Sequence, residues 1–132
     1  MQVPPKFSRL HSSPFSDLAG PFYLCHEDVL PVVGLFIEPA HANTMGFAHG
    51  GLLAALADIA LGQTLKAALP EGTRAVTANL NITYLGTAAL GDWIEARTTL
   101  DRQGKRLVFA ACELTSPSGV IAKVAATFAV AA

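Results

Sequence analysis

The fold is decided by one segment, Leu52-Leu-Ala-Ala-Leu-Ala-Asp-Ile-Ala-Leu-Gly-Gln-Thr-Leu-Lys-Ala-Ala-Leu69. Most of its residues are strong helix formers, and Pro70 and Gly72 stop the pattern, so it predicts one long α-helix. Apolar residues surround the helix axis instead of forming one stripe, which predicts that the helix is buried on nearly every side. Asp58 is the only acidic residue in this segment.

Extended segments lie on both sides of this helix. Residues 32–38, before it, are β-branched and aromatic and predict a first strand. Segments rich in Val, Ile, Thr and aromatic residues follow it, at 75–85, 93–102, 107–116 and 120–130. Turn-forming residues between the last three of these predict an antiparallel meander. The order β-α-β-β-β-β indicates an α+β fold in two layers, with a curved antiparallel sheet wrapped around one central helix.

The length of 132 residues predicts a single domain. Within it we expect an N-terminal arm over 1–31 and a core over 32–130. The arm contains five of the eight prolines, so it is predicted to be mostly loop, with a short helical turn near residues 15–19.

The composition restricts the possible partners. Hydrophobic residues make up 52% of the chain and charged residues 14%, against about 25% charged in a typical soluble domain. So few charges leave apolar surface uncovered, and we therefore expect a homo-oligomer. A net charge of −1 with no long basic run disfavours nucleic-acid binding. No run of about 20 apolar residues is evident, so no membrane partner is expected.

The N-terminal residues and the cysteines bear on the cellular compartment. The first ten residues lack the apolar stretch of a secretory signal. Cys25 and Cys112 are far apart and show no CxxC spacing, so we expect neither a metal site nor redox chemistry. A metal pair of His41 and His49 is disfavoured because no acid or cysteine joins it at ligand spacing. A cytoplasmic location fits these features best.

Asp58 is the first candidate for chemistry. A carboxylate among Leu56, Ala57, Ile59 and Ala60 would lose hydration unless it faced a cleft or a partner. It is therefore either a functional acid in a cleft or an acid on the one wet edge of the helix, facing solvent or an arginine across an interface.

The stretch His49-Gly50-Gly51, at the start of the helix, is the second candidate. The first backbone N–H groups of a helix have no partner within it and lie at the positive end of its dipole, which suits a developing oxyanion. The two glycines could equally form a tight entry turn, and His49 could be a capping or packing residue.

The spacing of Gly50 and Asp58 restricts how they could cooperate. Eight residues along a helix span about 12 Å, too far for both groups to act on one carbonyl within one chain. If they share a reaction, Asp58 must come from one subunit and the Gly50 N–H from another, related by a two-fold axis. An oligomer would then be required for catalysis.

The string Asn43-Thr-Met-Gly46-Phe-Ala-His49-Gly50-Gly51, with Asp58 nine residues after the histidine, resembles the signature of hotdog-fold acyl-CoA thioesterases of the phenylacetate-degradation (PaaI-like) type. The similarity covers about residues 32–130. The predicted order of elements agrees with that fold, in which a curved antiparallel sheet wraps around one long helix.

The resemblance implies a role for each matching residue. Asp58 would act as general base for water or as direct nucleophile, and the Gly50 N–H would polarise the thioester carbonyl. Asn43 would orient the water or the thioester. His49 would hold the loop or approach the sulfur, and the hydroxyl of Thr77 would assist the water.

Coenzyme A would be part of the substrate and not a cofactor. Its phosphates call for cations, and Arg102, Lys105 and Arg106 gather around one predicted turn, although a solvated hairpin tip would look the same. The resemblance implies at least a dimer, and a dimer of dimers. Aromatic residues of the arm are candidates to line or cover the acyl pocket: Phe15, Phe22 and Tyr23. Tyr84 and Trp93 are interpreted as core or interface residues.

Two alternatives remain open at this level. One is a hotdog enoyl-CoA hydratase or dehydratase, which resembles a pattern with a catalytic histidine in a different loop. The other is a non-catalytic acyl-CoA-binding module. The sequence defines neither the acyl or aryl group nor the choice between nucleophile and base for Asp58.

Overall fold

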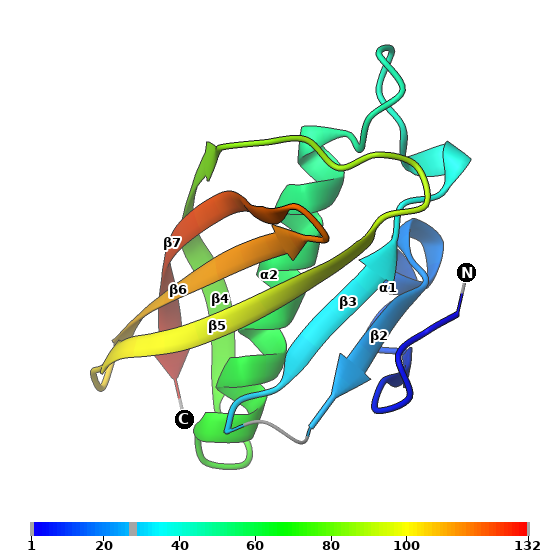
Figure 1. Cartoon of the computed structure of the whole chain (residues 1–132). Helices are drawn as coiled ribbons and strands as arrows, with labels where there is room; N and C mark the ends of the chain where they lie inside the picture. Colours follow the sequence, from blue (N-terminus) through cyan, green and yellow to red (C-terminus); the bar gives the residue numbers. More distant parts are fainter. Residues whose placement is uncertain (1, 27–28, 132) are drawn as a thin grey trace.

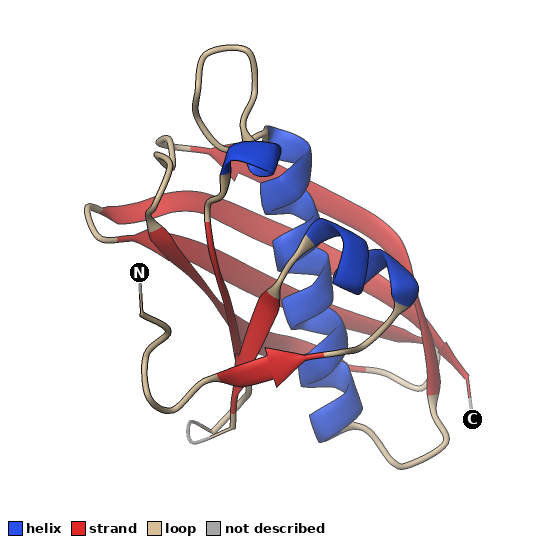
Figure 2. Ribbon diagram, turned by 90° about the vertical axis from the view of Figure 1, so that its right-hand side faces the viewer, coloured by secondary structure: helices blue, strands red, loops and turns tan. Residues whose placement is uncertain are grey.

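Helix α2 (Gly50–Ala68) lies against the inner face of one curved, seven-stranded antiparallel sheet (Figure 1). This computed structural model describes residues 2–26 and 29–131. The arrangement is the predicted α+β fold, and the helix begins two residues earlier than the sequence predicts. In Figure 2 the short helix α1 (Pro14–Ala19) crosses α2 on the side away from the sheet.

Along the chain, α1 lies between the first two strands, and α2 lies between the third and the fourth. A short 3-10 helix, η1 (Pro39–His41), precedes α2. Their bounds are β1 (Ser8–Leu10), β2 (Phe22–Cys25), β3 (Val32–Phe36), β4 (Arg74–Tyr84), β5 (Trp93–Gln103), β6 (Leu107–Ser116) and β7 (Gly119–Ala131). Their order in the sheet is β1-β2-β3-β5-β6-β7-β4. The predicted meander of β5, β6 and β7 is confirmed, and β4 pairs with β7 at one edge.

The N-terminal arm differs from its prediction. It contains the expected short helix α1, but it is not mostly loop, because β1 and β2 extend the sheet beyond β3. Its prolines at 4, 5, 14, 21 and 31 all lie outside these two strands, so they interrupt no ladder hydrogen bond. Phe22 of β2 is fully buried in the core, which attaches the arm to the rest of the domain.

Alternating side chains of the sheet form the core against α2. On β6, for example, Val108, Ala110, Cys112 and Leu114 are buried, while the residues between them face outward. Burial and the neighbouring Glu113 raise the pKa of the Cys112 thiol to about 12, so it stays protonated at neutral pH. Cys25 is also a buried free thiol.

Only one side of α2 is buried, which corrects the prediction of burial on nearly every side. Its buried residues recur at helical spacing, and they are Leu53, Leu56, Ala57, Ala60, Leu61, Thr64 and Leu65. Gly51, Gly62 and Lys66, on the other side, are exposed, and Asp58 is half-buried. The reason is that the sheet can cover only the side that it contacts. The small apolar residues of the opposite side, such as Ala54 and Ala55, are only partly buried in the single chain.

By length and mean hydropathy alone, α2 is long and apolar enough to cross a membrane, although polar residues interrupt it and it contains no run of about 20 apolar residues. In this fold, however, it is the central helix that packs on the sheet, and the core helix of a domain passes the same test.

An aromatic cluster covers part of the outer face of the sheet. Trp93 packs against the rings of Phe7, Tyr23 and Phe36. Trp93 also lies over Gly34, where any side chain would collide with its indole ring. Trp93 therefore packs in this partly exposed cluster and is not part of the core against α2, so its interpretation as a core residue is wrong and its place in an interface stays a prediction.

One polar contact crosses the core. The hydroxyls of Thr64 on α2 and Thr98 on β5 are both buried, and their oxygens are 2.5 Å apart. Each hydroxyl is the partner of the other, so this bond fixes the position of the helix against the strand without leaving a buried polar group unsatisfied.

We expect Thr64→Val to lower the free energy of unfolding by about 1–3 kcal/mol, because it leaves the Thr98 hydroxyl buried without a partner. The double variant Thr64→Val/Thr98→Val should recover most of that loss, since it removes both polar groups. Urea denaturation at a fixed protein concentration measures both effects. A double variant no more stable than Thr64→Val would contradict this account.

Candidate active site

The structure brings Asp58 and Thr77 together. Thr77 is on β4, and its hydroxyl donates a hydrogen bond of 2.7 Å to Oδ1 of Asp58 on α2. The ladder between β4 and β7 shifts register between Thr77 and Asn79, so Ala78 bulges beside the Thr77 position. The hydrogen bond engages only Oδ1 of Asp58, so the other carboxylate oxygen is outside it, and the role of Thr77 in assisting the water stays a prediction.

Asp58 and Thr77 line a cleft of about 820 Å³ at the C-terminal half of α2. Apolar residues from three elements form much of its wall: Leu65, Leu69, Pro70, Ala75 and Phe128. Lys66 and Glu71 add one charge of each sign. The cleft is large enough to hold part of an organic ligand beside the carboxylate.

The entrance of α2 is capped by His49. Its Nδ1 accepts a hydrogen bond of 2.8 Å from the Gly51 N–H, which confirms the capping alternative for this histidine. The Gly50 N–H, in contrast, has no hydrogen-bond partner among the residues that the structure describes. One backbone donor at the positive end of the helix dipole is therefore left for a ligand.

Tyr84 was missed as a site residue, and it contacts Gly50 directly. Its phenol donates a 2.6 Å hydrogen bond to the Gly50 carbonyl. Burial raises the pKa of Tyr84, which keeps the phenol protonated as a donor. A Cβ at position 50 would lie 3.2 Å from the Tyr84 oxygen, so a side chain there would crowd the ring. The contact joins residues 34 positions apart, and no local sequence pattern reveals it.

Asn43 shapes the loop before the helix. Its Oδ1 accepts hydrogen bonds from the N–H groups of Met45 and Phe47, at 2.9 and 3.1 Å. Gly46 completes this turn with a positive φ of 84°. In the single chain, Asn43 therefore stabilises the turn of this loop. Its role in orienting water or substrate stays a prediction.

The predicted site residues form two groups that do not meet within one chain. Asp58 and Thr77 line the cleft described above, whereas His49 and Gly51 line a separate cavity of about 360 Å³ between α1 and the start of α2. Gly50 and Asp58 remain about 12 Å apart by their helical spacing. Of the described residues, no group of three or more His, Cys, Asp or Glu could hold a metal ion.

The predicted basic cluster is an exposed hairpin tip between β5 and β6. Arg102, Lys105 and Arg106 form no ion pair with any described residue. The Arg106 carbonyl accepts a hydrogen bond from Val130 of β7, at the end of the sheet where β7 pairs with the start of β4. The tip therefore lies at the end of the sheet from which Ala75 and Phe128 line the Asp58 cleft.

Comparison with known proteins identifies the family. A family model described as the thioesterase superfamily matches residues 45–123, which is more than half of the chain. The chain belongs to the thioesterase superfamily. Its activity is thioester hydrolysis, with acyl-CoA esters as the general class of substrate.

Relatives of this superfamily member agree in sequence and structure. The Pseudomonas aeruginosa protein called "Putative esterase PA0474" is 40% identical over 131 residues, covering 97% of each chain. Mouse acyl-coenzyme A thioesterase 13 is 36% identical over 80 residues, which are 61% of this chain and 56% of the mouse protein. A mutant of the phenylacetic acid degradation protein PaaI of Thermus thermophilus superposes with a TM-score of 0.79 at 26% identity, covering 89% of this chain and 98% of the other. The hotdog fold and the PaaI-like resemblance are thereby confirmed.

We expect His49→Ala to lower the free energy of unfolding by about 1 kcal/mol, because the helix loses its side-chain cap. His49→Asn should retain most of the stability, since asparagine caps helices well. Chemical denaturation of the two variants beside the wild type measures the difference. An equal loss in both variants would show that the stabilising role of His49 is not the cap.

Proposed function

We propose that this chain hydrolyses acyl-CoA thioesters at a site shared between two copies. Asp58 and Thr77 of one copy would face the Gly50 N–H of the other. The observation that carries the proposal is the Gly50 N–H, which lacks a partner among the described residues, on the same helix as the Asp58–Thr77 pair but about 12 Å away. A two-fold axis between two antiparallel α2 helices would bring each amide to the partner's carboxylate.

The chemistry follows from these groups. As a general base, Asp58 would take a proton from water through the oxygen that Thr77 does not bind, and the water oxygen would attack the thioester carbon. The Gly50 N–H and the helix dipole would stabilise the oxyanion. Collapse breaks the C–S bond, and the coenzyme A thiolate leaves and is protonated. Direct attack by Asp58 would instead form an anhydride that water then hydrolyses.

His49 and Asn43 would act mainly by holding this geometry. The Nδ1 of His49 is engaged by the Gly51 N–H, so only its Nε2 could approach the thioester sulfur. Asn43 fixes the loop that leads into the helix. The placement of the reacting carbonyl against the Gly50 N–H would then depend on both residues, because small displacements at such a site reduce the rate strongly.

Two exposed surfaces support the assembly. The uncovered side of α2 carries small apolar residues, and β4 is an edge strand that pairs with β7 on one side only. Val76 on β4 is 67% exposed in the single chain. Joining two copies along these surfaces would cover them and avoid a free sheet edge. We propose a dimer as the active unit, and a dimer of dimers as the whole assembly.

The basic hairpin tip would meet the coenzyme A phosphates. Arg102, Lys105 and Arg106 lie at the end of the sheet near the Asp58 cleft, and they have no acidic partner among the described residues. Phosphate binding by such cations is charge-assisted. Coenzyme A enters as substrate and not as cofactor, and the composition still favours a cytoplasmic enzyme with neither nucleic-acid nor membrane partner.

We expect Asp58→Asn to reduce kcat for acyl-CoA hydrolysis by about 10²- to 10⁴-fold, because the amide cannot accept the proton. Release of free coenzyme A thiol, followed with a thiol reagent, measures the rate. Glu113→Gln, which removes an acid from the outer face of the sheet, is the matched control and should keep full activity. Wild-type turnover by Asp58→Asn would contradict the mechanism. Hydration of an enoyl-CoA without thiol release would favour the hydratase alternative.

Mixing of subunits tests the shared site. Gly50→Pro removes the free N–H at the first helical position, and His49 already has the extended conformation that precedes proline. Because any Cβ at position 50 crowds the Tyr84 ring, Gly50→Ala, which adds a Cβ but keeps the N–H, is the matched control and should retain far more activity than Gly50→Pro. Asp58→Ala and Gly50→Pro should each be inactive alone. Mixed after dissociation, they should recover about a quarter of the wild-type activity, because half of the dimers then hold one intact site. Circular dichroism checks that both variants fold, and no recovery in verified mixed dimers would place both groups in one chain.

A further inference from the structure

We infer that the cavity between α1 and the start of α2 binds the acyl group of the thioester, and that α1 determines which acyl groups are accepted. This inference rests on the proposed function, since it places the thioester carbonyl at the Gly50 N–H. It adds the substrate class, which is neutral acyl groups of compact size, and it assigns Phe15 and Leu18 as specificity residues.

The position of the cavity supports this assignment. His49 and Gly51, on either side of Gly50 in sequence, both line it. Leu52 and Ala55 of α2 continue the wall away from the Gly50 position. Gly50 itself does not line the cavity, so a carbonyl held at its N–H would lie at the rim between His49 and Gly51, and the substituent that would enter the cavity is the acyl group.

Helix α1 supplies the opposite wall. Phe15 and Leu18 line the cavity, and they are 57% and 85% exposed in the chain. Of the six residues in α1, only Ser16 is buried. In these positions the two large apolar side chains contribute little to the core. Contact with an apolar ligand would bury them, and this burial would favour binding.

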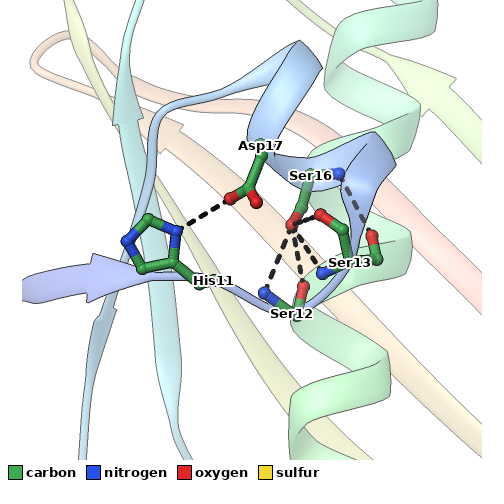
Figure 3. Close-up of polar contacts among 5 residues, drawn as sticks. All are labelled: His11, Ser12, Ser13, Ser16 and Asp17. Carbon is green, nitrogen blue, oxygen red and sulfur yellow. Dashed lines mark hydrogen bonds and ion pairs between the residues drawn. The ribbon is translucent and has the colours of Figure 1, made fainter.

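The N-terminal end of α1 is held by polar contacts that Figure 3 shows. The Ser16 N–H donates to the Ser13 hydroxyl, and the Ser13 N–H donates to the Ser16 hydroxyl, which together form a capping box. The Ser12 N–H also donates to the Ser16 hydroxyl, and the His11 ring bonds the Asp17 carboxylate at 2.9 Å. These contacts fix the start of the helix.

His41 holds the other end of α1. Its Nδ1 accepts a hydrogen bond from the Glu38 N–H, so its Nε2 carries the proton and donates it to the Ala19 carbonyl at 2.8 Å. His41 is buried and itself lines the cavity. The local bonds define where α1 starts, and His41 holds its C-terminal end, so that Phe15 and Leu18 form a wall of the cavity; a wall that discriminates between substrates requires such support.

The two cavities would take the two halves of the substrate. The basic tip lies near the Asp58 cleft, so the coenzyme A phosphates would lie on that side. In the shared site, the thioester lies between the Gly50 N–H of one copy and the Asp58 cleft of the other. Coenzyme A would then occupy the cleft of the copy that provides Asp58, and the acyl group would occupy the α1 cavity of the copy that provides Gly50.

Size and charge define the substrate class. At about 360 Å³, the cavity is at the low end of the range for ligand pockets, about 300–1,000 Å³, which suits one aromatic ring or a short to medium chain. Among the described residues that line it, Glu38 carries a charge and none is Lys or Arg. An acyl group that carries its own carboxylate would be repelled by Glu38, and no Lys or Arg of the lining could neutralise it. We therefore expect neutral acyl groups to be preferred.

A substrate series on the full-length protein tests the inference. We expect the wild type to hydrolyse hexanoyl-CoA and benzoyl-CoA with kcat/KM at least tenfold above adipoyl-CoA, which adds a terminal carboxylate to the same six-carbon chain. Leu18→Trp fills the cavity and should lower kcat/KM for hexanoyl-CoA and benzoyl-CoA about tenfold or more, while acetyl-CoA changes less than twofold. Val120→Trp, at an exposed site on the β6–β7 hairpin, is the matched control and should change none of them.

A binding measurement separates this inference from the proposed function. Calorimetry with S-hexyl-coenzyme A, a thioether that cannot be hydrolysed, should show about tenfold weaker binding to Leu18→Trp, with binding of free coenzyme A unchanged. Thiol release by the wild type together with equal effects of Leu18→Trp on all substrates would overturn the acyl cavity and leave the hydrolase. Weakened S-hexyl-coenzyme A binding without thiol release from any substrate would overturn the hydrolase and leave the cavity.

Discussion

The packing of one side of α2 against the sheet is the contact on which the other features depend. It buries Leu56, Ala60 and Leu61 and so leaves the opposite side of the helix uncovered. Because α2 is a rigid rod, the positions of Gly50 and Asp58 on it are fixed relative to each other. The sheet therefore does more than stabilise the helix. It orients a fixed pair of chemical groups toward the surface at which a second copy would bind.

Thr77 and Tyr84 show how β4 serves this arrangement. Both are on the edge strand, and each donates a side-chain hydrogen bond to α2, one to the Asp58 carboxylate and one to the Gly50 carbonyl. The strand thus contacts α2 at both proposed reactive positions. The strand can do this because both side chains lie on the face of the sheet against which α2 packs. The free backbone edge of β4 makes it a candidate for pairing with a second copy.

Much of this fold could be predicted from local patterns, and the failures have physical causes. The 107–116 strand and the meander followed from β-propensity and turns. The resemblance assigned Asp58 and Thr77 to one site, whereas the hydrogen bond between them was found only in the structure. The strands of the arm were missed because each is too short to show a period, and Phe22 is buried through contacts with distant segments. Tyr84 was missed for a related reason, since tertiary structure alone brings it to Gly50. The single-sided burial of α2 could not be read from its composition, because its uncovered side is also largely apolar.

Helix α1 belongs to neither the central meander nor the edge strand β4, and the hydrogen bond from His41 to the Ala19 carbonyl ties its C-terminal end to the segment before α2. Sequence changes on its exposed side, at Phe15 and Leu18, can therefore alter the α1 cavity without contacting the Asp58–Thr77 pair. Acyl selectivity and thioester chemistry would then be encoded in separate segments of the chain.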